Sequence, residues 1–197
     1  MATLTDLVNE VYTITNRPDL VAETTAAVKA ATLKAHQSDF YYKDILEIPV
    51  EFPSDAYIQA LEYRAIVPLY RALSYIRLTD STGIDTGPLL DICTPHETID
   101  NYGVNKTNIA YVAGQVIQIR AETKFQYIFL GCYVHPSIVD ATYNSWIANE
   151  HPYAIIFDAC ATIFKMIGFD EQVKMYRDMV NEQLAEVKIS NIQAEGY

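Results

Sequence analysis

The chain has 197 residues, of which half are apolar and a fifth are charged, so its composition is that of a globular protein and not of a disordered one. The 14 basic and 25 acidic residues give a formal net charge of −11. The acidity is diffuse and no basic arm or patch interrupts it, which argues against a protein that grips a nucleic-acid backbone. It still permits a protein that surrounds DNA without gripping it. The fifteen tyrosines fit either large partner surfaces or tyrosine-rich strands.

Cysteine usage and hydropathy predict a soluble protein of the cytoplasm. Cys93, Cys132 and Cys160 are odd in number and far apart, and the last two lie in apolar runs, so we expect reduced core residues. The apolar run at residues 152–167 carries two charges and is shorter than the roughly 20 residues that a membrane helix needs. We therefore expect no membrane segment.

Two helices are predicted before the first strand. Over residues 3–15, Thr3 and Asp6 form a capping box, and an apolar face follows at helical spacing. Pro18 is expected to open a second helix that runs to about Ala35. Small side chains line this second helix and permit close packing, for which the helical hairpin at residues 152–189 is the expected partner. They are Ala22, Ala26, Ala27, Ala30, Ala31 and Ala35.

Residues 40–136 have the composition of a β-rich region. Strands are predicted at 45–52, 56–64 and 72–80, with Pro49 and Pro53 limiting the pairing of the first. A turn-rich loop follows at 79–88, and then a second capping box, Thr94 with Glu97, predicts a short helix that ends at Gly103.

A hairpin is the strongest signal in this region. Alternating strands at 109–113 and 117–120 flank Gly114 and Gln115, and a glycine in the first position of a two-residue loop is typical of a type II′ turn. The next strand, 124–135, is apolar on both faces and is therefore expected to be central, or exposed only to a partner. A short helix containing Trp146 is predicted at 138–148.

The chain closes with a predicted helical hairpin. Its first helix, 152–167, is apolar on nearly every side, except for a narrow stripe formed by Asp158, Thr162 and Lys165. The second helix, 170–189, is amphipathic. Residues 190–197 lose the helical period and are predicted to form a tail that is free or ordered by a partner.

Taken together, the predicted elements indicate a single α+β domain. Helices at 3–36 and 138–189 pack as a bundle, and the mainly antiparallel β region at 40–136 is inserted between them.

The motifs of common catalytic and metal sites are missing from the sequence. His36, His96, His135 and His151 have no metal-ligand spacing, and no nucleotide-binding loop or nucleophile elbow occurs. We expect no cofactor and no metal. The best candidate for a catalytic group is Asp158, because burial on an apolar helix would raise the pKa of its carboxyl. The competing interpretation is structural, with Asp158 paired to a lysine or to a neighbouring subunit, and it is favoured because no catalytic partner is visible.

The order of many short segments resembles the head–tail adaptor proteins of tailed bacteriophages, in particular the adaptors of the podovirus portal. The resemblance covers nearly the whole chain and depends on the succession of the segments, since no single one is diagnostic. The segments are residues 4–20, 32–36, 39–44, 102–107, 111–114, 125–127, 131–134, 145–148, 151–152, 155–157 and 189–197.

This resemblance implies a structural virion protein of the neck, made in the host cytoplasm. Twelve copies would form a ring beneath the portal protein, and DNA would only pass through its lumen on the way to the tail. The end of the last helix and the tail would bind the portal through Lys188, Ile189, Asn191, Ile192 and Tyr197. The loop at 81–88 would contact the tail nozzle or tube protein, or a neighbouring subunit, through Thr82, Ile84, Asp85 and Thr86.

Three alternatives stay open at this point. The second hypothesis, after the ring-forming adaptor, is a neighbouring neck component, such as a stopper or a tail-completion protein, and another is a general protein-interaction module. The third alternative is a small cytosolic enzyme that uses Asp158 in a pocket.

Overall fold

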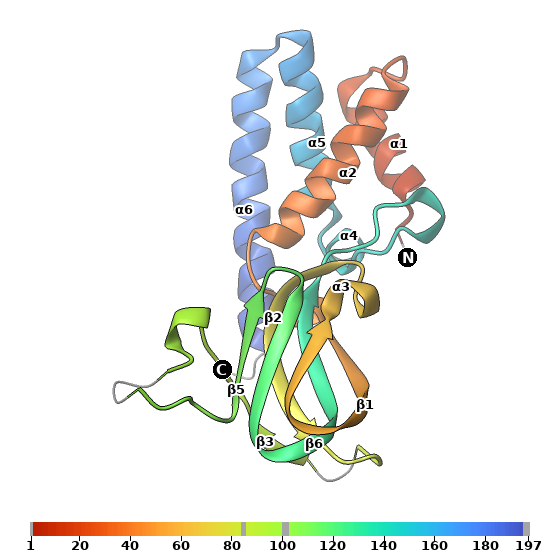
Figure 1. Cartoon of the computed structure of the whole chain (residues 1–197). Helices are drawn as coiled ribbons and strands as arrows, with labels where there is room; N and C mark the ends of the chain where they lie inside the picture. The colour runs from red at the N-terminus through yellow and green to blue at the C-terminus, as the bar shows by residue number, and fades with distance from the viewer. Residues whose placement is uncertain (1, 84–85, 100–102, 195–197) are drawn as a thin grey trace. The chain divides into compact units, whose positions relative to one another are not determined.

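The computed structural model describes residues 2–83, 86–99 and 103–194. Its helices and its mixed sheet form an α+β fold, which confirms the predicted class. The chain divides into two compact units, which we call the helical unit (residues 2–44 and 135–194) and the β unit (residues 45–134). The β unit is therefore an insertion between the first helices and the last ones (Figure 1).

The helical unit begins with α1 (Leu4–Thr15) and α2 (Val21–Gln37). The capping box predicted for α1 is present, since the Thr3 hydroxyl accepts a hydrogen bond from the Asp6 N–H at 3.1 Å. The predicted start of α2 at Pro18 is wrong. Pro18 lies in a turn, where the Arg17 guanidinium binds the Asp19 carboxylate, and a proline suits a turn as well as a first helical turn.

Three more helices complete this unit: α4 (Trp146–Glu150), α5 (Pro152–Ile167) and α6 (Asp170–Ala194). The predicted hairpin of α5 and α6 is confirmed, and Gly168, with a φ of 83°, ends α5 in the left-handed conformation that a glycine adopts without strain. α5 is the central helix and packs against α1, α2, α4 and α6 (Figure 1). Its buried side chains are Ala154, Ile155, Ile156, Ala159, Cys160, Ala161, Ile163 and Phe164.

The small side chains of α2 divide between two faces. Ala27, Ala31 and Ala35 are buried and α2 packs on α5, which confirms the predicted partner for this face. The other three alanines of the set, Ala22, Ala26 and Ala30, are exposed.

The last helix is longer than predicted. α6 continues to Ala194 and does not end at Ile189, so the boundary of the predicted tail at residue 190 is wrong. Val187 and Asn191 lie one turn apart on the buried face, at 0 % and 8 % exposure. Because the second of these residues is polar, it interrupts the apolar pattern from which the helix end was predicted, although it is packed like a core residue.

The β unit contains one mixed sheet. Its strands are β1 (Ile45–Glu62), β2 (Tyr70–Thr79), β3 (Thr86–Leu89), β4 (Asp91–Ile92), β5 (Ile109–Ala113) and β6 (Val116–Val134), with the short helix α3 (Tyr63–Ile66) after β1. The order is β3-β2-β6-β5-β4, and β1 also pairs with β6. All pairs are antiparallel except β4 with β5. β6 contacts three strands, so the prediction of a central strand is confirmed.

In two places, consecutive segments that were predicted as separate strands form one continuous strand in the structure. β1 includes the predicted strand 45–52 and most of the predicted strand 56–64, which ends at Glu62 because α3 begins at Tyr63. The register of β1 with β6 shifts between Glu51 and Ala56, around Pro53. An irregularity in the pairing thus accommodates the missing N–H of the proline without ending the strand. β6 likewise joins the segments at 117–120 and 124–135. In the hairpin turn, φ is positive at Gly114 (65°) and negative at Gln115, as a type II′ turn requires.

Two predicted helices are shorter than expected. The Thr94–Glu97 capping box is present, but it starts only the 3-10 turn Pro95–Glu97, after which the Thr98 carbonyl accepts a hydrogen bond from the Lys106 N–H at 2.9 Å. The segment at 138–148 contains a 3-10 turn, Asp140–Thr142, and then α4. Within the described residues, no helix has both the length and the hydropathy needed to cross a membrane.

Candidate functional site

The last turns of α6 are fixed to the segment that precedes β1. The Tyr42 N–H donates to the Asn191 side-chain oxygen at 3.1 Å, and Lys188 Nζ lies 3.8 Å from Asp39 Oδ2. These two contacts are one helical turn apart on α6, so residues 39–42 run alongside the last turns of the helix. Asn191 therefore acts as an anchor inside the helical unit, and its side chain faces inward.

Apolar side chains are exposed on both sides of this junction. Phe40, Tyr42 and Ile189 are 52 %, 54 % and 56 % exposed. Together with Lys188, which is also exposed, they form what we call the α6-end surface. Large apolar side chains that cluster at an exposed position are typical of protein–protein contacts, and tyrosine and phenylalanine are enriched there.

The structure separates the residues predicted to bind the portal. Lys188 and Ile189 are exposed on the α6-end surface, whereas Asn191 is buried. Ile192 lies in α6, and Tyr197 is outside the described residues. Of the predicted tail-side residues, Thr82 follows β2 and Thr86 begins β3, while Ile84 and Asp85 are outside the described residues.

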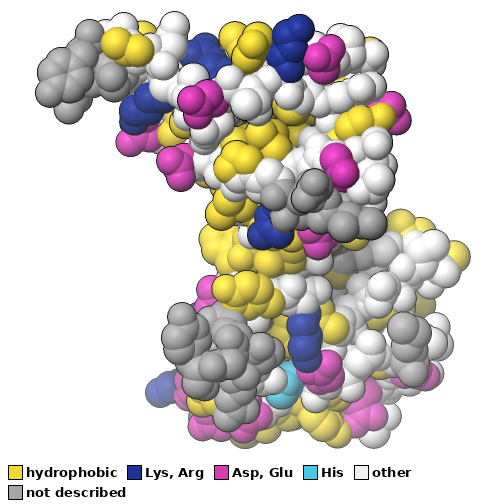
Figure 2. All heavy atoms as spheres, turned by 90° about the horizontal axis from the view of Figure 1, so that it is seen from below, with side chains coloured by type: hydrophobic (Ala, Val, Ile, Leu, Met, Phe, Trp, Pro, Cys, Tyr) yellow, Lys and Arg dark blue, Asp and Glu magenta, His cyan; other side chains and the backbone are white. Residues whose placement is uncertain are grey.

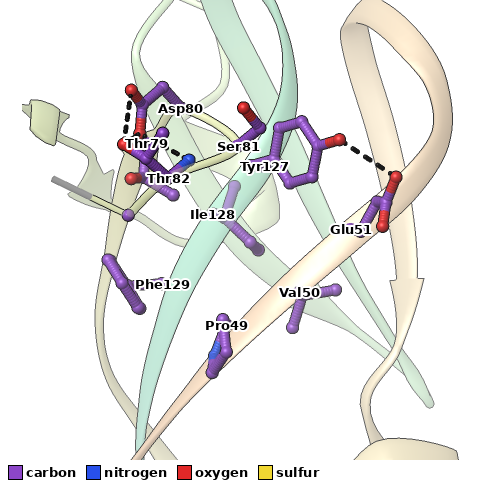
Figure 3. Close-up of a pocket in the computed structure, with 11 residues that line it drawn as sticks. Pro49, Val50, Glu51, Thr79, Asp80, Ser81, Thr82, Tyr127, Ile128 and Phe129 are labelled. Atoms are coloured by element: carbon purple, nitrogen blue, oxygen red, sulfur yellow. Dashed lines mark hydrogen bonds between the residues drawn. The ribbon is translucent and has the colours of Figure 1, made fainter. Parts of the chain in front are cut away.

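A groove in the β unit lies beside Thr82. It has a volume of about 470 Å³ and opens between β1, β2 and β6 (Figure 3). Its apolar lining comes from Pro49, Val50, Ile128 and Phe129, and its acidic groups are Glu51 and Asp80. The remaining lining residues are Thr79, Ser81, Thr82, Gly83 and Tyr127.

The two carboxylates of this groove are held in place by hydrogen bonds. Asp80 Oδ1 accepts from the Thr82 N–H at 3.0 Å and from the Thr82 hydroxyl at 2.8 Å, which fixes the start of the loop. Glu51 Oε1 accepts from the Tyr127 hydroxyl at 3.0 Å (Figure 3). This hydrogen bond to Glu51 raises the pKa of the Tyr127 phenol, which stays protonated and donating. An acidic groove with apolar walls is suited to a lysine or arginine side chain of a partner.

The structure also brings together a buried polar network that the sequence did not reveal. His36 Nδ1 lies 2.7 Å from Asp44 Oδ1, and His36 Nε2 lies 2.9 Å from the Ser145 hydroxyl. Trp146 Nε1 donates to the same Asp44 oxygen at 2.8 Å. The network joins α2, the turn Tyr42–Asp44 and the start of α4. No spacing in the sequence signals it, because Ser145 is more than 100 positions away from His36.

This arrangement has the connectivity of a Ser-His-Asp triad but lacks its accessibility. His36, Asp44 and Ser145 are 2 %, 5 % and 3 % exposed, so a substrate carbonyl has no route to the hydroxyl. The Ser145 hydroxyl is also occupied as the cap of α4, where it accepts from the Ala148 N–H at 3.1 Å. We interpret the network as the link that holds the two ends of the helical unit together.

Asp158, the candidate acid, forms an ion pair with Lys34 of α2. The structural interpretation of Asp158 expected a pairing of this kind, with a lysine. Within the described residues, no group of three or more His, Cys, Asp or Glu side chains is placed to hold a metal ion.

The surface drawn in Figure 2 carries acidic and basic side chains mixed among apolar ones, and the basic side chains that it shows stand apart from one another. This distribution agrees with the diffuse acidity of the sequence. No protein-family model matches the chain, and no curated protein matches it in sequence.

Proposed function

We propose that the chain is a structural subunit of the neck of a tailed bacteriophage, a ring-forming head–tail adaptor that joins the portal to the tail and leaves a channel for DNA. The observation that carries the proposal is the α6-end surface, where Phe40, Tyr42 and Ile189 are exposed beside the hydrogen bond between Tyr42 and Asn191. The resemblance to phage adaptors assigns portal binding to this same end of the chain. The ring, its twelve copies and its place in the virion come from that resemblance.

The energetics of such a surface suit a ring. Burying the exposed half of a large apolar side chain contributes about 1 kcal/mol, so three of them give a weak contact in a single copy. In a ring, all copies dock on one portal together, and the later contacts form at high effective concentration. A small surface on each subunit therefore suffices for stable attachment of the whole ring.

The acidic groove of the β unit supports a second contact. It lies at the start of the loop that the resemblance assigns to the tail side, and its carboxylates Glu51 and Asp80 favour a basic side chain of the next component. The net charge of −11 favours a lumen through which DNA slides without adhering, because like charges repel the phosphate backbone.

A substitution on the α6-end surface tests the portal contact. Ile189→Asp is expected to weaken binding to isolated portal rings by at least about tenfold, because it places a charge where apolar area is buried. Val139→Asp is a matched control, since Val139 is a comparably exposed apolar residue of the helical unit. Equal binding of the two variants, measured by co-sedimentation with portal rings, would contradict the assignment of this surface.

The composition of purified virions tests the function itself. Quantitative mass spectrometry is expected to find about a dozen copies of the chain per particle, as a ring on the portal requires. Absence from virions ends the proposal. Presence without any affinity for portal rings favours the alternative of a stopper or a tail-completion protein, which binds further down the neck.

A further inference from the structure

A groove between three helices of the helical unit concentrates positive charge in an acidic protein. α2 and α6 lie on either side of α5, and the groove above α5 has a volume of about 300 Å³. Three of the 14 basic residues of the chain line it, namely Lys34, Lys165 and Arg177. We call this feature the basic groove.

The charges of this groove are only partly compensated. Lys34 is paired with Asp158. Among the described residues, no carboxylate lies within ion-pair distance of Lys165 or Arg177. The polar stripe of α5, formed by Asp158, Thr162 and Lys165, thus faces the groove, which explains why an otherwise apolar helix carries it.

The floor and one wall of the groove are made of small side chains. Ala30 and Ala31 come from α2, and Ala161 and Thr162 from α5. Short side chains let the backbone of another helix approach closely, and the surrounding cations select for negative charge on it.

An exposed face with the opposite charge exists on the same chain. Glu171, Asp178 and Glu182 of α6 are all exposed. Their spacing of seven and four residues places them on one side of the helix, away from the buried Val173, Val180 and Val187. We call this side the acidic face of α6. The two surfaces differ, so they fit the head-to-tail contact that generates a ring, in which each subunit uses one patch for each neighbour.

We propose that the basic groove of one subunit receives the acidic face of α6 from the neighbouring subunit. This contact gives the proposed ring its specificity between subunits, and the inference therefore depends on the proposed function. Copies that each carry a charge of −11 repel one another, so assembly needs a local match of opposite charge. The contact is expected to weaken as the salt concentration rises, because the cations of the groove are exposed to solvent.

Two charge-reversed variants test the contact. The first, Lys165→Glu with Arg177→Glu, has an acidic groove and keeps its acidic face. The second, Asp178→Lys with Glu182→Lys, has a basic face and keeps its basic groove. Each alone is expected to assemble at least about 100-fold more weakly than the unmodified chain, since like charges then meet at every contact. An equimolar mixture is expected to restore rings in which the two variants alternate, because every groove then meets a face of opposite charge.

The readout is native mass spectrometry of the chain at high concentration and of rings assembled on the portal. Lys106→Glu with Lys124→Glu is the control, because it changes the net charge by the same amount as the first variant but lies in the β unit. Fluorescence of Trp146 verifies that the helical unit of each variant is folded. Alternating rings of 1:1 composition support the contact.

Two kinds of result overturn the inference and are distinguishable. Unmodified chains that form no ring, either alone or on the portal, overturn the proposed function together with this contact. If the unmodified chains form rings, two further results overturn the contact alone. One is that the folded groove variant assembles as well as the unmodified chain, and the other is that the mixture of the two variants fails to assemble.

Discussion

At the scale of single residues, Asp44 is a buried carboxylate that serves two donors of the helical unit. One carboxylate oxygen accepts hydrogen bonds from both His36 and Trp146, and the side chain is buried. A buried acceptor that serves two donors is expensive to remove, because both donors then lose their partner in a place that water does not reach.

Replacing Asp44 by alanine is expected to lower the free energy of unfolding of the helical unit by about 3 kcal/mol. The control is Asp140→Ala, because Asp140 also pairs with a base, Lys29, but is 72 % exposed, so a change within about 0.5 kcal/mol is expected. Denaturant unfolding followed by fluorescence measures both, since Trp146 is the single tryptophan of the chain and belongs to this unit. Equal effects of the two substitutions would show that the network is not a stabilising link.

The three thiols are expected to differ in reactivity. Burial raises the pKa of Cys132 to about 11 and that of Cys160 to about 12. At pH 8 both are neutral thiols, and the thiolate is the reactive form. Cys93 is partly exposed, and burial, followed by the nearby Glu97 carboxylate, also raises its pKa.

In the native protein at pH 8, one thiol per chain is expected to react with a soluble disulfide reagent, and the other two only after denaturation. The rate at Cys93 should increase as the pH is raised toward its pKa, because the thiolate fraction grows. Rapid reaction of three thiols in the folded chain would contradict the burial of Cys132 and Cys160.

At the scale of elements, α6 is the one that links packing to function. Its first part packs on α5, and its end is anchored to residue 42 and carries the α6-end surface. The same helix supplies Arg177 to the basic groove and Glu182 to the acidic face. Different sides of one helix thus serve the core and three proposed contacts.

Two truncations of this helix are expected to behave differently. A chain that ends at residue 189 loses the hydrogen bond between Asn191 and Tyr42, and its free energy of unfolding is expected to fall by about 1–2 kcal/mol. A chain that ends at residue 191 keeps this bond and should be close to full stability. Trp146 fluorescence measures stability, and co-sedimentation with portal rings measures binding. If the shorter chain is as stable as the longer one, Asn191 is not the anchor.

At the scale of the whole molecule, the β unit is an insertion whose two ends meet. Ile45, at the start of β1, is the register partner of Tyr133, near the end of β6. Paired residues of an antiparallel ladder lie about 5 Å apart. The chain therefore leaves and re-enters the helical unit at neighbouring points.

Replacing residues 46–132 by a short glycine-rich linker is expected to leave a folded helical unit, since a few residues close the gap. Circular dichroism should show a mainly helical spectrum with cooperative unfolding, and Trp146 should stay buried. Loss of cooperative unfolding in this shortened chain would show that the helical unit depends on the insertion. The portal contact should survive in it, whereas the contact assigned to the acidic groove should be lost.

Local sequence patterns were sufficient to predict the fold class and most of the elements. Capping boxes at Thr3 and Thr94, the hairpin at Gly114 and the stop at Gly168 act through the nearest residues of the chain, so local chemistry is enough to place them. The apolar pattern likewise identified β6 as central. It failed where a residue breaks the pattern but is held by tertiary contacts, as at Pro53 in β1 and Asn191 in α6.

Contacts between residues that are distant in the chain could not be predicted from local patterns. The network of His36, Asp44 and Ser145, the ion pair of Lys34 with Asp158, and the basic groove between α2, α5 and α6 each join segments far apart in the chain. Hydrophobic burial fixes how helices pack, and it is indifferent to which polar groups this brings together. The sequence therefore shows that Lys165 and Arg177 are charged, but it does not show that they line the same groove. The packing of α5 between α2 and α6 brings them together.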